Sequence, residues 1–142
     1  MSNFFPDALP APAVERDTRK FWEAASKHRL VIQRCTGCGA YRHPPVPVCG
    51  ECHSFEHEYT ESHGVGEVYS WIVGHQASHP ALKESVPYNA VVVRLRDCGG
   101  AKIVSNLVGI RNDEIKMGMA VRVMWEDVRE GVSFPRFEPL HP

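Results

Sequence analysis

The sequence lacks the short motifs that mark the common enzyme classes. It contains no Gly-x-Ser-x-Gly elbow, no His-Glu-x-x-His and no phosphate-binding glycine loop followed by Lys-Ser/Thr. No apolar run is long enough to span a bilayer, and the first residues lack the charged-then-apolar pattern of a secretory signal. The formal net charge of -1 provides no overall attraction for nucleic acid. These absences predict a cytoplasmic globular protein.

Four of the five cysteines form two Cys-x-x-Cys pairs, Cys35 with Cys38 and Cys49 with Cys52. Each pair can turn tightly enough to aim both sulfurs at one point, and four thiolates complete a tetrahedral shell around zinc. We therefore predict one structural zinc ion in a compact ribbon, with iron in the same cage as the less favoured alternative. Disulfides are disfavoured because the chain carries no secretory signal. His53 follows Cys52 and could replace it as a ligand, but we expect it to lie outside the shell.

The residues before the cysteines predict an arm and a helix. Residues 1–12 contain three prolines and several apolar side chains, which indicates an extended arm that packs on its own domain or on another subunit. Apolar residues at helical spacing then predict a helix over residues 13–27, anchored by Phe21 and Trp22. The short β-prone segments around the cysteines predict the ribbon strands, at residues 30–34, 41–43 and 55–59.

From Gly64 onward the sequence alternates strands with turns, with no long helix. Pro135 indicates an edge position for the last strand, and the glycines of the first strand allow it to bend. Five strands at this spacing predict a small closed barrel of the OB type. The expected strands are residues 64–74, 88–96, 102–108, 120–125 and 132–137.

Few residues outside the cysteine pairs suggest catalysis. Cys98 could be a nucleophile, but it lies in a predicted hairpin turn and is expected to be a bystander. His75 or His79, in the long loop of residues 75–86, could act as a general base, yet neither has a carboxylate or nucleophile paired with it in the sequence. We expect no catalytic residue.

A basic stretch could bind a partner or a phosphate-bearing ligand. Residues 16–42 contain seven Lys or Arg and two Asp or Glu, a net charge of +5. Arg34 and Arg42 belong to this stretch, and with Phe21 and Trp22 they are our candidates for contact with a partner or with acyl-CoA.

The order of these features resembles the family first described as domain of unknown function 35, whose members combine a rubredoxin-like zinc ribbon with an OB fold. Nearly the whole chain takes part in the resemblance. The residues on which the resemblance rests are Phe21-Trp22-Glu23, Leu30 through Gly39, Pro44-Pro45 through Cys52, Gly64-x-Gly66-x-Val68-Tyr69-Ser70, Pro87-Tyr88 and Gly118-Met119-x-Val121. Gly50 and His53 depart from the family pattern, which often has Pro and Gly there.

The resemblance implies a fold and a role. It implies a mainly β chain with an N-terminal arm and helix (1–29), a zinc ribbon (30–60) and an OB-fold domain (61–142). It also implies a non-catalytic accessory subunit, in a hetero-oligomer with a thiolase-superfamily enzyme that acts on acyl-CoA thioesters, such as a thiolase or a retro-aldolase. Some relatives accompany enoyl-CoA hydratases, which is an alternative partner.

A nucleic-acid-binding module is the alternative from another functional class, because zinc ribbons and OB barrels both serve that function. The barrel segment argues against it, since residues 61–142 hold nine Lys or Arg against ten Asp or Glu.

Overall fold

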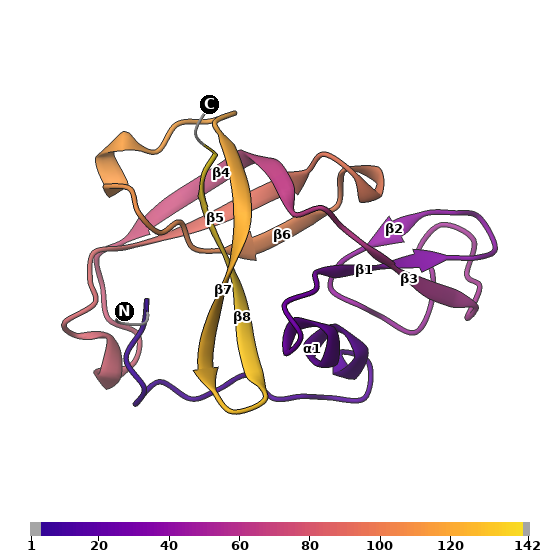
Figure 1. Ribbon diagram of the computed structural model, residues 1–142, viewed down its shortest axis with the longest axis horizontal. Coiled ribbons are helices and arrows are strands. Elements are labelled where there is room, and N and C mark those ends of the chain that lie inside the picture. The colour runs from indigo at the N-terminus through magenta and orange to yellow at the C-terminus, as the bar shows by residue number, and fades with distance from the viewer. Residues whose placement is uncertain (1–3, 141–142) are drawn as a thin grey trace.

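The computed structural model describes residues 4–140, which form two antiparallel sheets and one short helix (Figure 1). The small sheet has the order β2-β1-β3, and the five-stranded sheet has the order β6-β5-β4-β7-β8. This arrangement confirms the predicted mainly β class, with a helix, a ribbon and a five-stranded barrel. The elements are α1 (Arg19–Ala25), β1 (Val31–Cys35), β2 (Tyr41–Arg42), β3 (His57–Glu61), β4 (Val65–Gly74), η1 (Pro80–Leu82), β5 (Tyr88–Leu95), η2 (Cys98–Gly100), β6 (Lys102–Ser105), η3 (Asn112–Glu114), β7 (Ala120–Arg129) and β8 (Val132–Pro139).

The large sheet curls into a nearly closed barrel. A bulge in β4 shifts its register against β5 between Val68 and Ser70, which increases the local bend of the strand. Gly66 lies so close to the Arg94 carbonyl on β5 that a Cβ atom would collide with the backbone there. The bridge between Leu107 and Phe137 then closes the barrel on the side of β6 and β8. β8 lies at the edge of the sheet, as Pro135 predicted.

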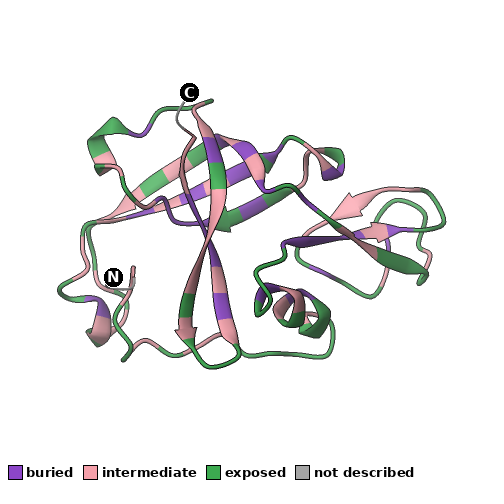
Figure 2. Ribbon diagram, in the orientation of Figure 1, coloured by how far each residue is buried: buried purple, intermediate pink, exposed green. Residues whose placement is uncertain are grey.

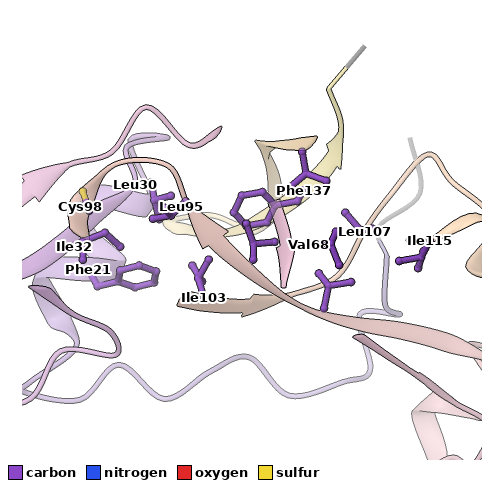
Figure 3. Packing of buried hydrophobic residues seen from close by; sticks show 13 residues of the cluster. Phe21, Leu30, Ile32, Val68, Leu95, Cys98, Ile103, Leu107, Ile115 and Phe137 are labelled. Atoms are coloured by element: carbon purple, nitrogen blue, oxygen red, sulfur yellow. The ribbon is translucent and has the colours of Figure 1, made fainter. Parts of the chain in front are cut away.

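Alternating burial along the barrel strands produces the core. In β5, Val91, Val93 and Leu95 are each at most 1% exposed, and the residues between them are more accessible, as Figure 2 shows. The same core continues into the ribbon, because Leu30 and Ile32 belong to the same buried cluster (Figure 3). Ribbon and barrel therefore share one hydrophobic core.

The helix is shorter than its apolar spacing predicted. It begins at Arg19 and ends at Ala25, instead of running over residues 13–27. Thr18 exchanges hydrogen bonds with the backbone of Glu15, which forms a turn before the helix, and Val14 is left 51% exposed. At the other end, His28 takes a positive φ of 59°, which ends the helical path.

The remaining helix covers the barrel beside β8. Phe21 is 5% exposed and packs in the shared core, while the Trp22 ring meets the Phe134 ring of β8 edge to face at 5.6 Å. Beyond the helix, His28 stacks on Trp125 and bonds Asp127 at 2.8 Å, so the helix end is attached to β7. The helix thus joins the ribbon to the barrel.

The predicted arm packs on its own barrel, from its first described residue onward; residues 1–3 lie outside the described part. The Phe4 N–H donates to Glu126 at 2.8 Å, and the Phe5 ring contacts Tyr88 at 5.5 Å. Both rings also lie over the guanidinium of Arg136, each at 5.5 Å. The arm was expected to pack either on its own domain or on another subunit, and in this structure it packs on its own domain.

No helix among residues 4–140 is long and apolar enough to cross a membrane.

Truncating Phe21 should reveal how much the shared core depends on the helix. We expect Phe21→Ala to lower the free energy of unfolding by about 3–4 kcal/mol, because it removes a buried ring and leaves a cavity. Val14→Ala, at an exposed position, should change it by less than about 0.5 kcal/mol. Urea denaturation measures both values, and a Phe21→Ala midpoint equal to that of Val14→Ala would refute the structural role of the ring.

Candidate metal centre and partner-contact residues

The two cysteine pairs adopt the same backbone turn. The Gly39 N–H donates to the Cys35 carbonyl at 2.8 Å, and the His53 N–H donates to the Cys49 carbonyl at 3.0 Å. Gly39 has φ +83° and His53 has φ +64°, so each turn ends in the left-handed region. A side chain at that conformation costs about 1 kcal/mol relative to glycine. His53 therefore occupies the position in the second turn that Gly39 occupies in the first. This is a backbone role, and it does not require the His53 side chain to bind a metal.

The turns bring the four sulfurs together. One ligand atom from each of Cys35, Cys38, Cys49 and Cys52 lies within 4.8 Å of all the others, and the group includes no histidine. Sulfurs of opposite turns are 3.5 Å (Cys35 to Cys52) and 3.6 Å (Cys38 to Cys49) apart. A tetrahedral site with metal–sulfur bonds of about 2.3 Å separates its sulfurs by about 3.8 Å, whereas a disulfide requires about 2.05 Å. The spacing fits a shared metal ion.

Backbone groups in both turns favour the thiolate form. The pKa of Cys35 is lowered to about 6, mainly because the Cys38 N–H donates to its sulfur. The pKa of Cys49 is lowered chiefly by the Cys52 N–H and then by the Glu51 N–H, which lies 3.4 Å from the sulfur. Both effects stabilise negative charge on these two sulfurs before metal binding. Cys38 differs, because the Ala40 N–H lowers its pKa less than burial and the neighbouring cysteines raise it, to about 12. Four cysteines fill a tetrahedral shell, so the centre can hold structure but leaves no position for a substrate.

The predicted contact residues do not converge on one site. Arg34 donates to Glu58 at 2.9 Å and lies over the Tyr41 ring, on the surface of the ribbon. Arg42 donates to the Val46 carbonyl, and two of its other nitrogens are buried without a partner among the described residues. Phe21 and Trp22 lie at the barrel instead, as described above. No observation tests whether these four residues meet a partner or acyl-CoA, so this remains a prediction.

The charge of the basic stretch is partly compensated by strand β3. Glu58 pairs with Arg34, and Glu61 pairs with Arg29 at 2.9 Å. The net charge of +5 was counted over residues 16–42 and therefore left out these two carboxylates. It overstated the positive charge that a ligand would meet on this surface. Surface pairs of this kind contribute little to stability but do change the local field.

The comparisons with known proteins agree with this geometry. A family model for the ChsH2 rubredoxin-like zinc ribbon domain matches residues 22–58, and one for the ChsH2 C-terminal OB-fold domain matches residues 59–126. A solved structure described as Ltp2-ChsH2(DUF35) aldolase is 43% identical, with a TM-score of 0.80, and covers 91% of this chain and 98% of its own. The chain belongs to the DUF35 family.

Two curated relatives extend the comparison of this DUF35 chain. A probable enoyl-CoA hydratase alpha subunit from Thermomonospora curvata is 44% identical over 138 residues, which are 96% of this chain and 42% of that protein. The chain therefore spans about two fifths of the length of that relative. A DUF35 domain-containing scaffold protein from Methanocaldococcus jannaschii is 26% identical over 113 residues, which are 79% of this chain and 78% of that protein.

The other candidate residues of this DUF35 chain have structural environments. Cys98 is 6% exposed, and burial is the main reason that its pKa rises to about 11, so it is a poor nucleophile. The His79 Nδ1 accepts from the Ala81 N–H at 3.0 Å and caps the short helix η1. His75 is exposed in the β4–β5 loop.

Sequence reasoning missed the buried polar residues, of which Arg136 is the charged one. Arg136 is 8% exposed, and its guanidinium bonds Asn106 at 2.6 Å and Glu126 at 3.4 Å. Burial lowers the pKa of Arg136, although Glu126 opposes this effect. Strand alternation places Arg136 on the face of β8 opposite the core residue Phe137, where Phe4 and Phe5 of the arm cover it, so no local pattern marks it as buried.

Removing a single sulfur should abolish metal binding. We expect Cys49→Ser to reduce bound metal from about one ion per chain to near zero, because three thiolates and a hydroxyl bind zinc or iron far more weakly. Cys98→Ser, outside the shell, should retain the full content. Elemental analysis of the purified proteins measures this, and equal metal in the two variants would contradict the four-sulfur centre.

Acidification should destabilise the protein through His43. Desolvation lowers the pKa of His43 to about 4 from its usual 6.5, so the unfolded chain takes up the proton first as the pH falls. The stabilisation is complete above pH 6.5 and is lost between about 6.5 and 4, at a total cost on the order of 3 kcal/mol.

Comparison with His43→Phe isolates this effect from protonation of the cysteines, which both proteins share. Urea unfolding at pH 7 and pH 5 should show the larger loss in the wild type. A loss of the same size in His43→Phe would mean that His43 does not titrate on folding.

Proposed function

We propose that this chain is a non-catalytic accessory subunit of a thiolase-superfamily enzyme, a thiolase or retro-aldolase acting on acyl-CoA thioesters, which it stabilises and whose acyl-CoA site it helps to form. One observation carries the proposal. The chain matches 98% of the length of a chain in the solved Ltp2-ChsH2(DUF35) aldolase at 43% identity. A match over nearly the whole of that chain supports the same kind of role.

The chemistry of the described residues supports a scaffold. The metal centre presents four protein ligands and no open position, and the buried thiol of Cys98 has a raised pKa. We propose that the metal is zinc, because a four-sulfur tetrahedral shell in a matched zinc ribbon domain is the typical structural zinc site. The elemental analysis described above distinguishes it from iron.

An exposed apolar face on the barrel is where we place the partner. Ile72 on β4 is 66% exposed and Val104 on β6 is 72% exposed. The register puts both on the outer face of the sheet, because Ile72 pairs with Ala90, and Val104 pairs with Val92 two residues along β5. Exposed apolar residues grouped in this way mark interaction surfaces.

The rim of this face carries positive charge. Lys102 lies 4.5 Å and Arg94 5.7 Å from the centre of the Tyr69 ring, and neither cation has an ion-pair partner among residues 4–140. The face therefore suits a partner whose contact surface is apolar with an acidic border.

The description of one relative supports a second class of partner protein. The Thermomonospora curvata relative is described as a probable enoyl-CoA hydratase alpha subunit. A hydratase subunit is therefore the alternative partner, and the same scaffold role would apply.

Co-purification tests the proposal. The tagged chain is co-expressed separately with a thiolase-superfamily protein and with an enoyl-CoA hydratase subunit from the same genome. We expect a complex with the thiolase-superfamily protein, and we expect Ile72→Asp to weaken it at least about tenfold because a charge is buried in the contact.

Val14→Asp provides the matched control, since Val14 is an exposed aliphatic residue outside this face. A complex formed only with the hydratase subunit would favour the alternative. A complex with neither protein would refute the accessory role, and equal weakening by both substitutions would refute the assigned face.

A further inference from the structure

The outer edge of the ribbon sheet is open. β3 lies at one end of the strand order β2-β1-β3, so it is paired on one side alone, with β1. The Ser62 N–H donates to the Leu30 carbonyl at 2.8 Å, and the Thr36 N–H donates to the Glu56 carbonyl at 3.2 Å. These two bonds lie just beyond the two ends of β3, and they fix which of its residues face β1.

Three residues of β3 turn their backbone groups away from β1. In an antiparallel ladder, residues whose N–H and C=O groups bond the neighbouring strand alternate with residues whose groups point the other way. Glu56 and Ser62 bond the β1 side, and so does every second residue between them. The N–H and C=O groups of His57, Tyr59 and Glu61 therefore point to the open edge, where no strand among residues 4–140 meets them.

The features that usually prevent a second strand from pairing are missing along β3. Natural edge strands avoid pairing through prolines, bulges or unpaired charges. β3 contains no proline, and its register against β1 is uninterrupted. Glu58 and Glu61 are charged, but each forms an ion pair in its own chain, with Arg34 and Arg29 respectively, at 2.9 Å. The edge can therefore accept an extended strand.

The sequence of β3 is complementary to itself in the antiparallel direction. A two-fold axis at Tyr59 sets Tyr59 opposite its own copy and His57 opposite Glu61 of the second chain, twice by symmetry. This register joins the residues whose backbone groups are open, so each pair can exchange two hydrogen bonds. It also sets an imidazole against a carboxylate and one phenol ring against another, which are favourable cross-strand pairs.

The same arrangement would cover an exposed aromatic residue. Phe55 lies just before β3 and is 72% exposed. In an antiparallel pair, the beginning of one strand lies beside the end of the other. Phe55 of one copy therefore comes next to the residues of the second copy that lead from Glu61 into β4. Burial of this ring adds apolar contact to a pairing that is otherwise polar.

We propose that this chain pairs with a second copy of itself through β3, so that the two ribbons form one continuous sheet. A second copy is favoured over an unrelated strand because it presents His57 and Glu61 in the reversed order that this register needs. The surface lies on the ribbon, apart from the barrel face that we assign to the enzyme partner, and the inference goes beyond the proposed function.

Sedimentation equilibrium of the metal-loaded full chain tests the pairing. We expect the average mass to rise with concentration from that of one chain toward that of two. The Kd should be on the order of 100 μM, because one strand pair is smaller than a standard protein interface.

Two matched substitutions locate the contact. His57→Glu places carboxylates opposite each other in both outer pairs, and should weaken the association about tenfold. His75→Glu makes the same change at an exposed residue of the β4–β5 loop, at the end of the barrel far from the ribbon (Figure 1). It should leave the Kd within about twofold of the wild type.

A compensating change tests the register. Combining His57→Glu with Glu61→Lys restores opposite charges in both outer pairs, and should return the Kd to within about threefold of the wild type. Glu61→Lys also removes the partner of Arg29, but an exposed ion pair of this kind contributes little to stability. Elemental analysis of bound metal in each variant verifies that the ribbon is intact.

Hydrogen exchange identifies the residues that pair. As the chain concentration rises, exchange at the N–H groups of His57, Tyr59 and Glu61 should slow. Exchange at Glu58 and Thr60, whose N–H groups already face β1, should stay the same.

The proposal is overturned if the chain keeps the mass of one copy up to about 1 mM, or if the double variant associates no better than His57→Glu. Slower exchange at the three open N–H groups only after the thiolase-superfamily protein is added would also overturn it, and would assign the edge to that protein. Self-association by a chain that forms no complex in the co-purification would support the strand pairing while refuting the accessory role.

Discussion

The ribbon depends on the four-sulfur centre, because its strands alone are too small to hold it. Its sheet has three strands, of which β2 contains two residues and β3 has no buried residue. Such a sheet is marginal in water without further support. Metal binding by four cysteines supplies on the order of 10 kcal/mol to small ribbons, and the turns at Gly39 and His53 present the sulfurs for it. The metal centre thus makes the ribbon a rigid part of the chain.

The ribbon holds the barrel in a fixed position because the two share one hydrophobic core. Leu30 and Ile32 of the ribbon and Phe21 of the helix belong to the same buried cluster as the inward residues of β5 (Figure 3). The outward face of the same barrel keeps Ile72 and Val104 exposed. A protein with a well-packed core and an apolar outer face is suited to bind and support another protein, which is the role we propose.

Local patterns predicted the fold well, and long-range pairing accounts for what they missed. Cys-x-x-Cys spacing and strand alternation are local, so the ribbon and barrel followed from the sequence. The helix was predicted too long because periodicity cannot detect the turn that Thr18 makes with Glu15. The pairing of Arg136 with Glu126 and the meeting of His43 with Phe21 were not predictable, since they depend on how distant segments fold together.

The central claim is that this chain assists catalysis and performs none. Steady-state turnover of an acyl-CoA thioester tests it most directly, with this chain alone, the proposed thiolase-superfamily partner alone and the two together. The account predicts no turnover by this chain alone and a higher rate for the pair than for the partner. Turnover by this polypeptide unaided, or equal rates with and without it, would contradict the account.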